Sequence, residues 1–208
     1  MKSWKNILIL SLCIVLILMA IPALGIGHLT LKLGNYTSTL TLMHIPVIVA
    51  ALFTGFYGAL ITGFVFGAAS FINAFFSSSG ILNQFFKNPL CSILPCILFA
   101  FFAYYLFLLL QSKFSMKNVF AGLITAFAAS VFHSFCMTSS MYIFMHKQIL
   151  QAMHGLNWFE LIKMLMPQIL QESFAAVLVV GAIYLFIWLN AEFNWKTIKI
   201  GAKERSDD

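Results

Sequence analysis

The sequence predicts an all-α, polytopic membrane protein with six transmembrane helices in a compact bundle. Of its 208 residues, 62% are hydrophobic and only 9% are charged, whereas a soluble domain carries about 25% charged residues. At about 20 residues per span, this length accommodates about six helices joined by short loops. Residues 1–208 are therefore expected to form a single membrane domain without a separate soluble catalytic module.

The basic residues predict how the chain is oriented. Lys and Arg gather on the cytoplasmic side of membrane proteins, and six spans with both termini inside put most of them there. We therefore expect a multi-pass protein of the cell membrane with two cytoplasmic termini, and we assign the net charge of +6 to topology rather than to nucleic-acid binding. The residues that carry this argument are Lys2, Lys5, Lys113, Lys117, Lys196, Lys199, Lys203 and Arg205.

The first half of the chain predicts three spans, at residues 7–27, 44–55 and 57–76. The first of them also resembles a secretory signal, with Pro22–Gly25 as an alternative cleavage site. The outer loop at residues 28–41 alternates weakly between leucine and polar residues. That pattern indicates either an extended segment folded over a cavity mouth or a plain connector.

Small residues recur along the third expected span at intervals of three or four. On a helix such positions share one face, and in lipid they let two helix backbones approach closely. We expect this stripe to pack the third span against the second. Its members are Ala59, Gly63, Gly67, Ser70 and Ala74.

The second half predicts spans at residues 89–110, 118–145 and 167–189, followed by a cytoplasmic tail at 190–208. Part of the connection at 146–163 has the spacing of an amphipathic turn that lies along the membrane interface. A second series of small residues in the fifth span again predicts close helix packing. It consists of Gly122, Ala126, Ser130 and Ser134.

Polar side chains within the spans indicate a binding site, because ionisable groups in a membrane are costly and usually functional. With both termini inside, these residues fall in the outer half of the bundle and predict a polar pocket that opens outward. Alternative roles are a histidine bridge between helices, a carboxyl group at the headgroup level, and asparagines that cap helix ends. The candidate substrate-binding residues are His44, Asn73, Lys87, Asn88, His133, Ser134, Gln168 and Glu172.

Motifs of several enzyme classes are missing from the sequence. It contains no HExxH, no GxSxG and no GxxxxGK[ST] phosphate loop. Its four cysteines form no CxxC pair, so we expect no disulfide, metal site or other cofactor. Three alternatives to substrate capture remain: an intramembrane enzyme with His133 and Glu172 as an acid–base pair, a secondary carrier, and a scaffold or assembly subunit.

Several motifs in combination resemble the substrate-binding S components of energy-coupling factor (ECF) vitamin transporters. The resemblance covers about residues 7–190. It rests on Met43–Ile48, on the glycines of the third span with Asn73, on Asn88–Leu90 with Ser92 and Leu94–Pro95, on Gly122 and on Glu172–Ala175.

The resemblance implies a six-helix subunit that captures a vitamin-like small molecule from outside. Transport would then need a transmembrane coupling subunit and two ATPase subunits, supplied as other chains. Pantothenate is the leading substrate, with Lys87 or a protonated His133 on its carboxylate and Asn73, Asn88 and Gln168 on its polar body. A buried Glu172 argues against an anion unless it is protonated or hydrogen-bonded. Folate, riboflavin, a queuosine precursor and other heterocycles stay open.

The sequence departs from the family pattern at positions that the resemblance places in the pocket. Cys96 stands where members commonly carry arginine, and Phe132–His133 stand where they carry a threonine–asparagine pair. Gln168 stands where they carry asparagine. These are the positions at which a different ligand would be recognised.

Overall fold

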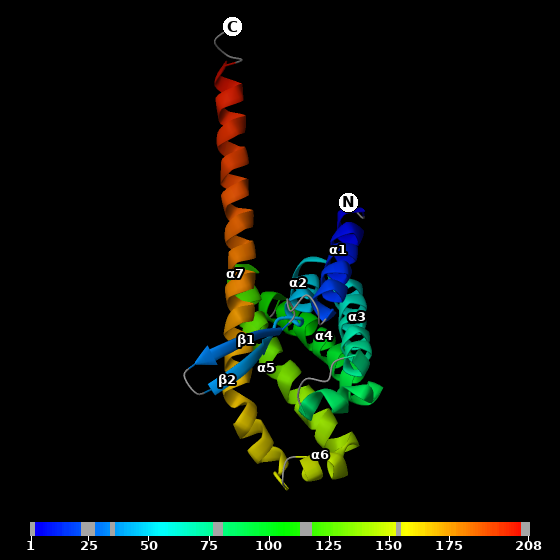
Figure 1. The fold of residues 1–208 in the computed structure, drawn as a ribbon. Coiled ribbons are helices and arrows are strands. Elements are labelled where there is room, and N and C mark those ends of the chain that lie inside the picture. The colour runs from blue at the N-terminus through cyan, green and yellow to red at the C-terminus, as the bar shows by residue number, and fades with distance from the viewer. Residues whose placement is uncertain are drawn as a thin grey trace.

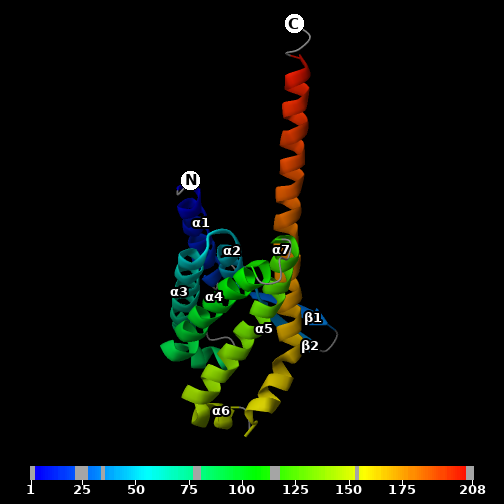
Figure 2. The ribbon, with the colours of Figure 1, turned by 180° about the vertical axis from the view of Figure 1, so that it is seen from behind.

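The computed structural model describes residues 3–21, 28–33, 36–76, 81–112, 118–152 and 155–204, which form a helical bundle with one β-hairpin (Figures 1 and 2). The elements in chain order are α1 (Ser3–Ala20), β1 (His28–Leu33), β2 (Tyr36–Thr41), α2 (Ile45–Phe53), α3 (Phe56–Phe76), the 3₁₀ helix η2 (Ile81–Lys87), α4 (Pro89–Ser112), α5 (Asn118–Phe144), α6 (His146–Ala152) and α7 (Trp158–Glu204).

Four described helices are long and apolar enough to cross a membrane: α3, α4, α5 and the part of α7 up to Asn190. The apolar part of α1, Trp4–Ala20, is shorter. Helix α2 has 9 residues, which at the helical rise extend only about 14 Å, roughly half of a bilayer core. The structure thus shows a multi-pass, all-α membrane fold, but it does not confirm six full spans.

The local sequence explains why α2 is short. Pro46 occupies its first turn, where the missing N–H is tolerated. At the other end the hydroxyl of Thr54 donates to the carbonyl of Ala50 at 2.6 Å. Gly55 then adopts φ +88°, a left-handed conformation that other residues rarely take. The chain therefore turns directly into α3 at Phe56.

The small residues of α3 pack mainly against α4, so the expectation that they pack against the second span was wrong. A Cβ added at Gly63 would lie 2.7 Å from the Cβ of Ala100, and one added at Gly67 would lie 2.7 Å from the Cα of Ile93. The reason is that α2 is too short to accompany α3 along its length. Helix α4 returns along α3 after η2 and takes that place.

The loop between α1 and α2 contains an antiparallel hairpin, which confirms the extended segment expected there. The pairing runs from His28 opposite Thr41 to Leu33 opposite Tyr36. Strand β2 lies against α7, and the hairpin projects from the side of the bundle (Figure 1). The end of β2 is thereby held beside the last helix. The alternative cleavage site at Pro22–Gly25 lies outside the described residues.

Helix α7 begins before the expected start of the sixth span at residue 167. Asn157 and Glu160 cap it reciprocally: the Glu160 N–H donates to Asn157 Oδ1 at 3.0 Å, and the Asn157 N–H donates to Glu160 Oε2 at 2.9 Å. Pro167 lies inside the helix, which bends in its first, yellow turns (Figure 1). The helix also continues to Glu204, through the region where a tail was expected from residue 190.

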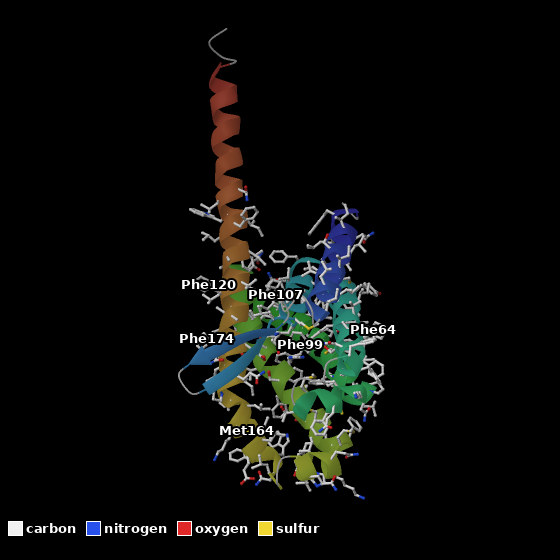
Figure 3. The ribbon with its side chains drawn as sticks, viewed as in Figure 1. Phe64, Phe99, Phe107, Phe120, Met164 and Phe174 are labelled. Carbon is white, nitrogen blue, oxygen red and sulfur yellow. The ribbon has the colours of Figure 1, made fainter. Side chains whose placement is uncertain are left out.

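Large apolar side chains cover the outside of the bundle, as lipid contact requires. Phe64, Phe120 and Phe174 are each more than half exposed, whereas Phe99 is fully buried; Figure 3 shows these residues on the ribbon. The beginning of α1 and the end of α7 lie at the same end of the molecule, and α6 lies at the other (Figures 1 and 2). An even number of crossings would produce this arrangement.

Candidate functional site

A cavity of about 130 Å³ lies between α3, α5 and α7. Along each helix the lining residues recur every three or four positions, with adjacent pairs at 133–134, 137–138 and 168–169, and so lie on one side of the helix. The lining residues are Phe66, Ser70 and Asn73 from α3; His133, Ser134, Met137, Thr138 and Met141 from α5; Leu165, Gln168, Ile169 and Glu172 from α7; and Thr41, Met43 and Phe86 from β2, the turn before α2, and η2.

Glu172 is the acidic group of this cavity, and its side chain is only 5% exposed. Its Oε1 accepts a hydrogen bond from the backbone N–H of Thr41 at 2.9 Å and another from Nε2 of Gln168 at 3.0 Å. Gln168 lies one helical turn before it, so the spacing seen in the sequence gives this contact directly. The two donors fix the carboxyl group and tie the end of the hairpin to α7.

His133 provides the imidazole of the cavity, and aromatic rings hold it in place. Its ring centroid lies 5.2 Å from that of Phe66 and 4.9 Å from that of Phe99. Its Nε2 lies 3.9 Å from the sulfur of Cys96. His44 stacks behind it and is 1% exposed, but it is not among the described lining residues. The ring that can contact a ligand is therefore that of His133.

Asn73 offers an acceptor to a ligand. Its Oδ1 is buried and has no hydrogen-bond partner in the described part of the chain. Asn73 lines the cavity and also a separate apolar groove between α1 and α3. An unsatisfied amide oxygen beside a cavity is costly unless a ligand or water fills its bonding capacity.

Lys87 and Asn88 are not among the described lining residues, although the sequence pointed to both. Lys87 is exposed, and its Nζ lies 5.7 Å from the ring centroid of Phe75. The Oδ1 of Asn88 accepts the N–H of Leu90 at 3.0 Å, and its Nδ2 donates to the sulfur of Met145 at 3.4 Å. Asn88 thus caps α4, which starts with Pro89, in the usual Asn–Pro arrangement.

The apolar part of the lining was missed by sequence reasoning. In a chain that is 62% hydrophobic, composition does not separate residues that face a cavity from those that face lipid. Helical spacing from the polar candidates would have found several of them. Phe66 precedes Asn73 by seven positions, and Met137 and Met141 follow Ser134 by three and seven.

The site combines one carboxyl group, one imidazole and one unpaired amide oxygen with aromatic and thioether walls. Such a mixture of apolar surface and a few placed polar groups is typical of small-molecule sites. Among the described residues, no group of three or more His, Cys, Asp and Glu side chains is arranged to hold a metal ion.

Comparison with known proteins shows the family to which the chain belongs. The family model described as "ECF transporter, substrate-specific component" matches residues 5–198. The match includes every described residue that lines the cavity. No curated protein matches the chain. The chain therefore belongs to the family of substrate-specific components of ECF transporters, which are transport subunits rather than enzymes.

Proposed function

We propose that this chain captures a vitamin-like small molecule in the cavity between α3, α5 and α7 and delivers it to an ATP-driven coupling module. The observation that carries the proposal is the combination of a buried carboxyl group and an unpaired amide oxygen in one cavity, from Glu172 and Asn73. Family membership supplies the transport context.

The cavity is proposed to open to the outside of the cell. Phe86, Met141 and Leu165 line it near the end of the bundle where η2 and α6 lie, opposite the beginning of α1 and the end of α7 (Figure 1). The basic residues near both termini favour a cytoplasmic location for that other end. In this arrangement α1 and the half-length α2 complete six membrane segments with α3, α4, α5 and α7.

The proposed partners are a transmembrane coupling subunit and two ATPase subunits. Family membership implies an ECF module in general. The chain itself contains no GxxxxGK[ST] phosphate loop. We therefore assign substrate capture to this chain and ATP hydrolysis to the partner subunits.

Pantothenate is the reference substrate for testing. Asn73, His133 and Gln168 line the cavity, in reach of the hydroxyl and amide groups of a molecule bound there. Lys87, the proposed partner of the carboxylate, is not among the described lining residues. The polar body of pantothenate is thus better matched than its charge.

Native mass spectrometry of the gently purified chain tests capture. We expect a retained small molecule in the unmodified chain and its loss in Ser70→Phe, which fills the cavity. Ile61→Phe is the matched control, because Ile61 is on the same helix and is 48% exposed. Equal retention in all three proteins would show that the compound binds elsewhere.

Uptake measurements separate the alternatives. Capture predicts uptake only when the coupling subunits are co-expressed. A scaffold predicts neither a retained ligand nor a thermal shift with any vitamin. Uptake by this chain alone, abolished when the ion gradient is dissipated, would instead identify a secondary carrier.

A further inference from the structure

We infer that Glu172 makes this cavity selective for ligands that present a nitrogen donor, cationic or neutral, and that it discriminates against free carboxylates. The inference rests on the proposed function, since it concerns the molecule captured in this cavity. It assigns the site a class of substrate that differs from the anion expected from the sequence.

The cavity lining holds a carboxyl group but few basic groups. Among the described lining residues there is one carboxyl group, that of Glu172, and no lysine or arginine. The described lysines nearest in sequence to cavity residues lie over aromatic rings instead: Lys87 over Phe75 at 5.7 Å and Lys163 over Phe159 at 4.7 Å. His133 is the only basic side chain among the described lining residues, so the cavity leaves a place beside the buried carboxyl group for a positive or donor group from the ligand.

Uncharged donors hold the carboxyl group of Glu172. Two neutral donors, the N–H of Thr41 and Nε2 of Gln168, both meet its Oε1. They orient the carboxyl group, but neither donor carries a charge. A ligand N–H can donate to this group, whereas a ligand carboxylate has no hydrogen to donate and would place a second acidic group in the cavity.

The rest of the lining offers a further acceptor with aromatic and thioether side chains. The unpaired Oδ1 of Asn73 is a second acceptor. Phe66 and Phe86 present aromatic rings, and Met43, Met137 and Met141 present thioethers. Aromatic faces attract cations, and thioethers pack well against aromatic rings. Together these groups match a flat heteroaromatic compound that carries an amino group or ring N–H groups.

The experiment measures binding of matched compounds that differ mainly in charge. The purified chain is titrated with three pairs of compounds: pantothenol and pantothenate, nicotinamide and nicotinate, and pyridoxamine and 4-pyridoxate. In a second measurement, any compound that the chain retains through purification is fragmented in the mass spectrometer to identify its chemical groups. In each pair that binds, we expect the neutral or cationic member to bind about tenfold or more tightly than the carboxylate. We expect the retained compound to carry a nitrogen donor and no free carboxylate.

Glu172→Gln tests the residue itself. We expect this variant to bind both members of a pair with similar affinity. Glu160→Gln is the matched control, because Glu160 is an exposed acid in the first turn of the same helix, and it should keep the preference. The comparison of pairs on the unmodified chain does not depend on whether Glu172→Gln folds.

The outcomes separate the inference from the proposed function. A carboxylate that binds as tightly as its neutral partner, or a retained compound that has a free carboxylate or lacks a nitrogen donor, would overturn the inference and leave substrate capture intact. An unchanged preference in a folded Glu172→Gln would show that another group selects charge. An empty chain that no compound stabilises would contradict both.

Discussion

The imidazole rings of His44 and His133 lie nearly parallel, with their centroids 5.9 Å apart and an angle of 14° between their planes. The same His133 ring contacts Phe66 from α3 and Phe99 from α4. One cavity-lining side chain therefore joins the start of α2 and the middle of α3, α4 and α5. The packing of these helices around His133 therefore determines the shape of the cavity.

We predict that His133→Ala lowers both stability and ligand binding. Removing the ring leaves a void among Phe66, Phe99 and His44, and core truncations of this size cost about 2–4 kcal/mol of unfolding free energy. His133→Phe should keep most of that stability because it keeps a ring, while it loses the imidazole nitrogens. Thermal unfolding in detergent and ligand titration measure the two effects.

The control for this prediction is His146→Ala. His146 is exposed and contacts Tyr142 edge to face at 4.7 Å, so its removal should change stability little. If His133→Ala were as stable as this control, the ring packing would not matter to the fold. If His133→Phe bound ligand normally, the imidazole would have no role in recognition.

Gln168→Leu tests the support of the carboxyl group. It removes the donor at 3.0 Å from Glu172 Oε1 while keeping a side chain of similar size. Losing one hydrogen bond to this buried carboxyl group should cost about 1–2 kcal/mol of unfolding free energy and weaken ligand binding about fivefold to tenfold. Gln148→Leu, at an exposed position on α6, is the control, and equal affinities of the two variants would count against the support role.

Gly67→Ala tests the contact between α3 and α4. The added Cβ would lie 2.7 Å from the Cα of Ile93, a backbone atom that cannot move aside cheaply, so the folded yield and melting temperature should fall. Gly181→Ala is the matched control within a helix. Its added Cβ meets only Leu123 Cδ2 at 3.6 Å. Equal stability of the two variants would mean that the helices are not closely packed at Gly67.

The fold class and part of the site could be predicted from the sequence, because both depend on local patterns. Apolar composition indicates the membrane, and the four-residue step from Gln168 to Glu172 places both side chains on one face of α7. Asn73, His133 and Ser134 were found in the same way, as polar residues inside apolar helices, and they also line the cavity.

Features that depend on tertiary packing could not be predicted. The stripe containing Gly63 and Gly67 indicates that some helix packs closely there, but not that the partner is α4. The bond from Thr41 to Glu172 joins residues 131 positions apart, and no local pattern signals it. Asn88 was predicted to bind substrate or to cap a helix, and the structure shows the cap at the start of α4.

Substitution of Lys87 tests whether a residue outside the described cavity lining contributes to ligand affinity. Because its side chain is exposed over Phe75 and is not among the described lining residues, we predict that Lys87→Met leaves ligand affinity unchanged to within about twofold, since exposed cation–π contacts are worth little. Asn73→Leu, which removes the unpaired cavity acceptor, should in contrast weaken binding about tenfold. Titration of both variants with the same retained compound makes the comparison. A loss of affinity in Lys87→Met as large as that in Asn73→Leu would mean that the lysine reaches the ligand, as its position beside the expected pocket first suggested.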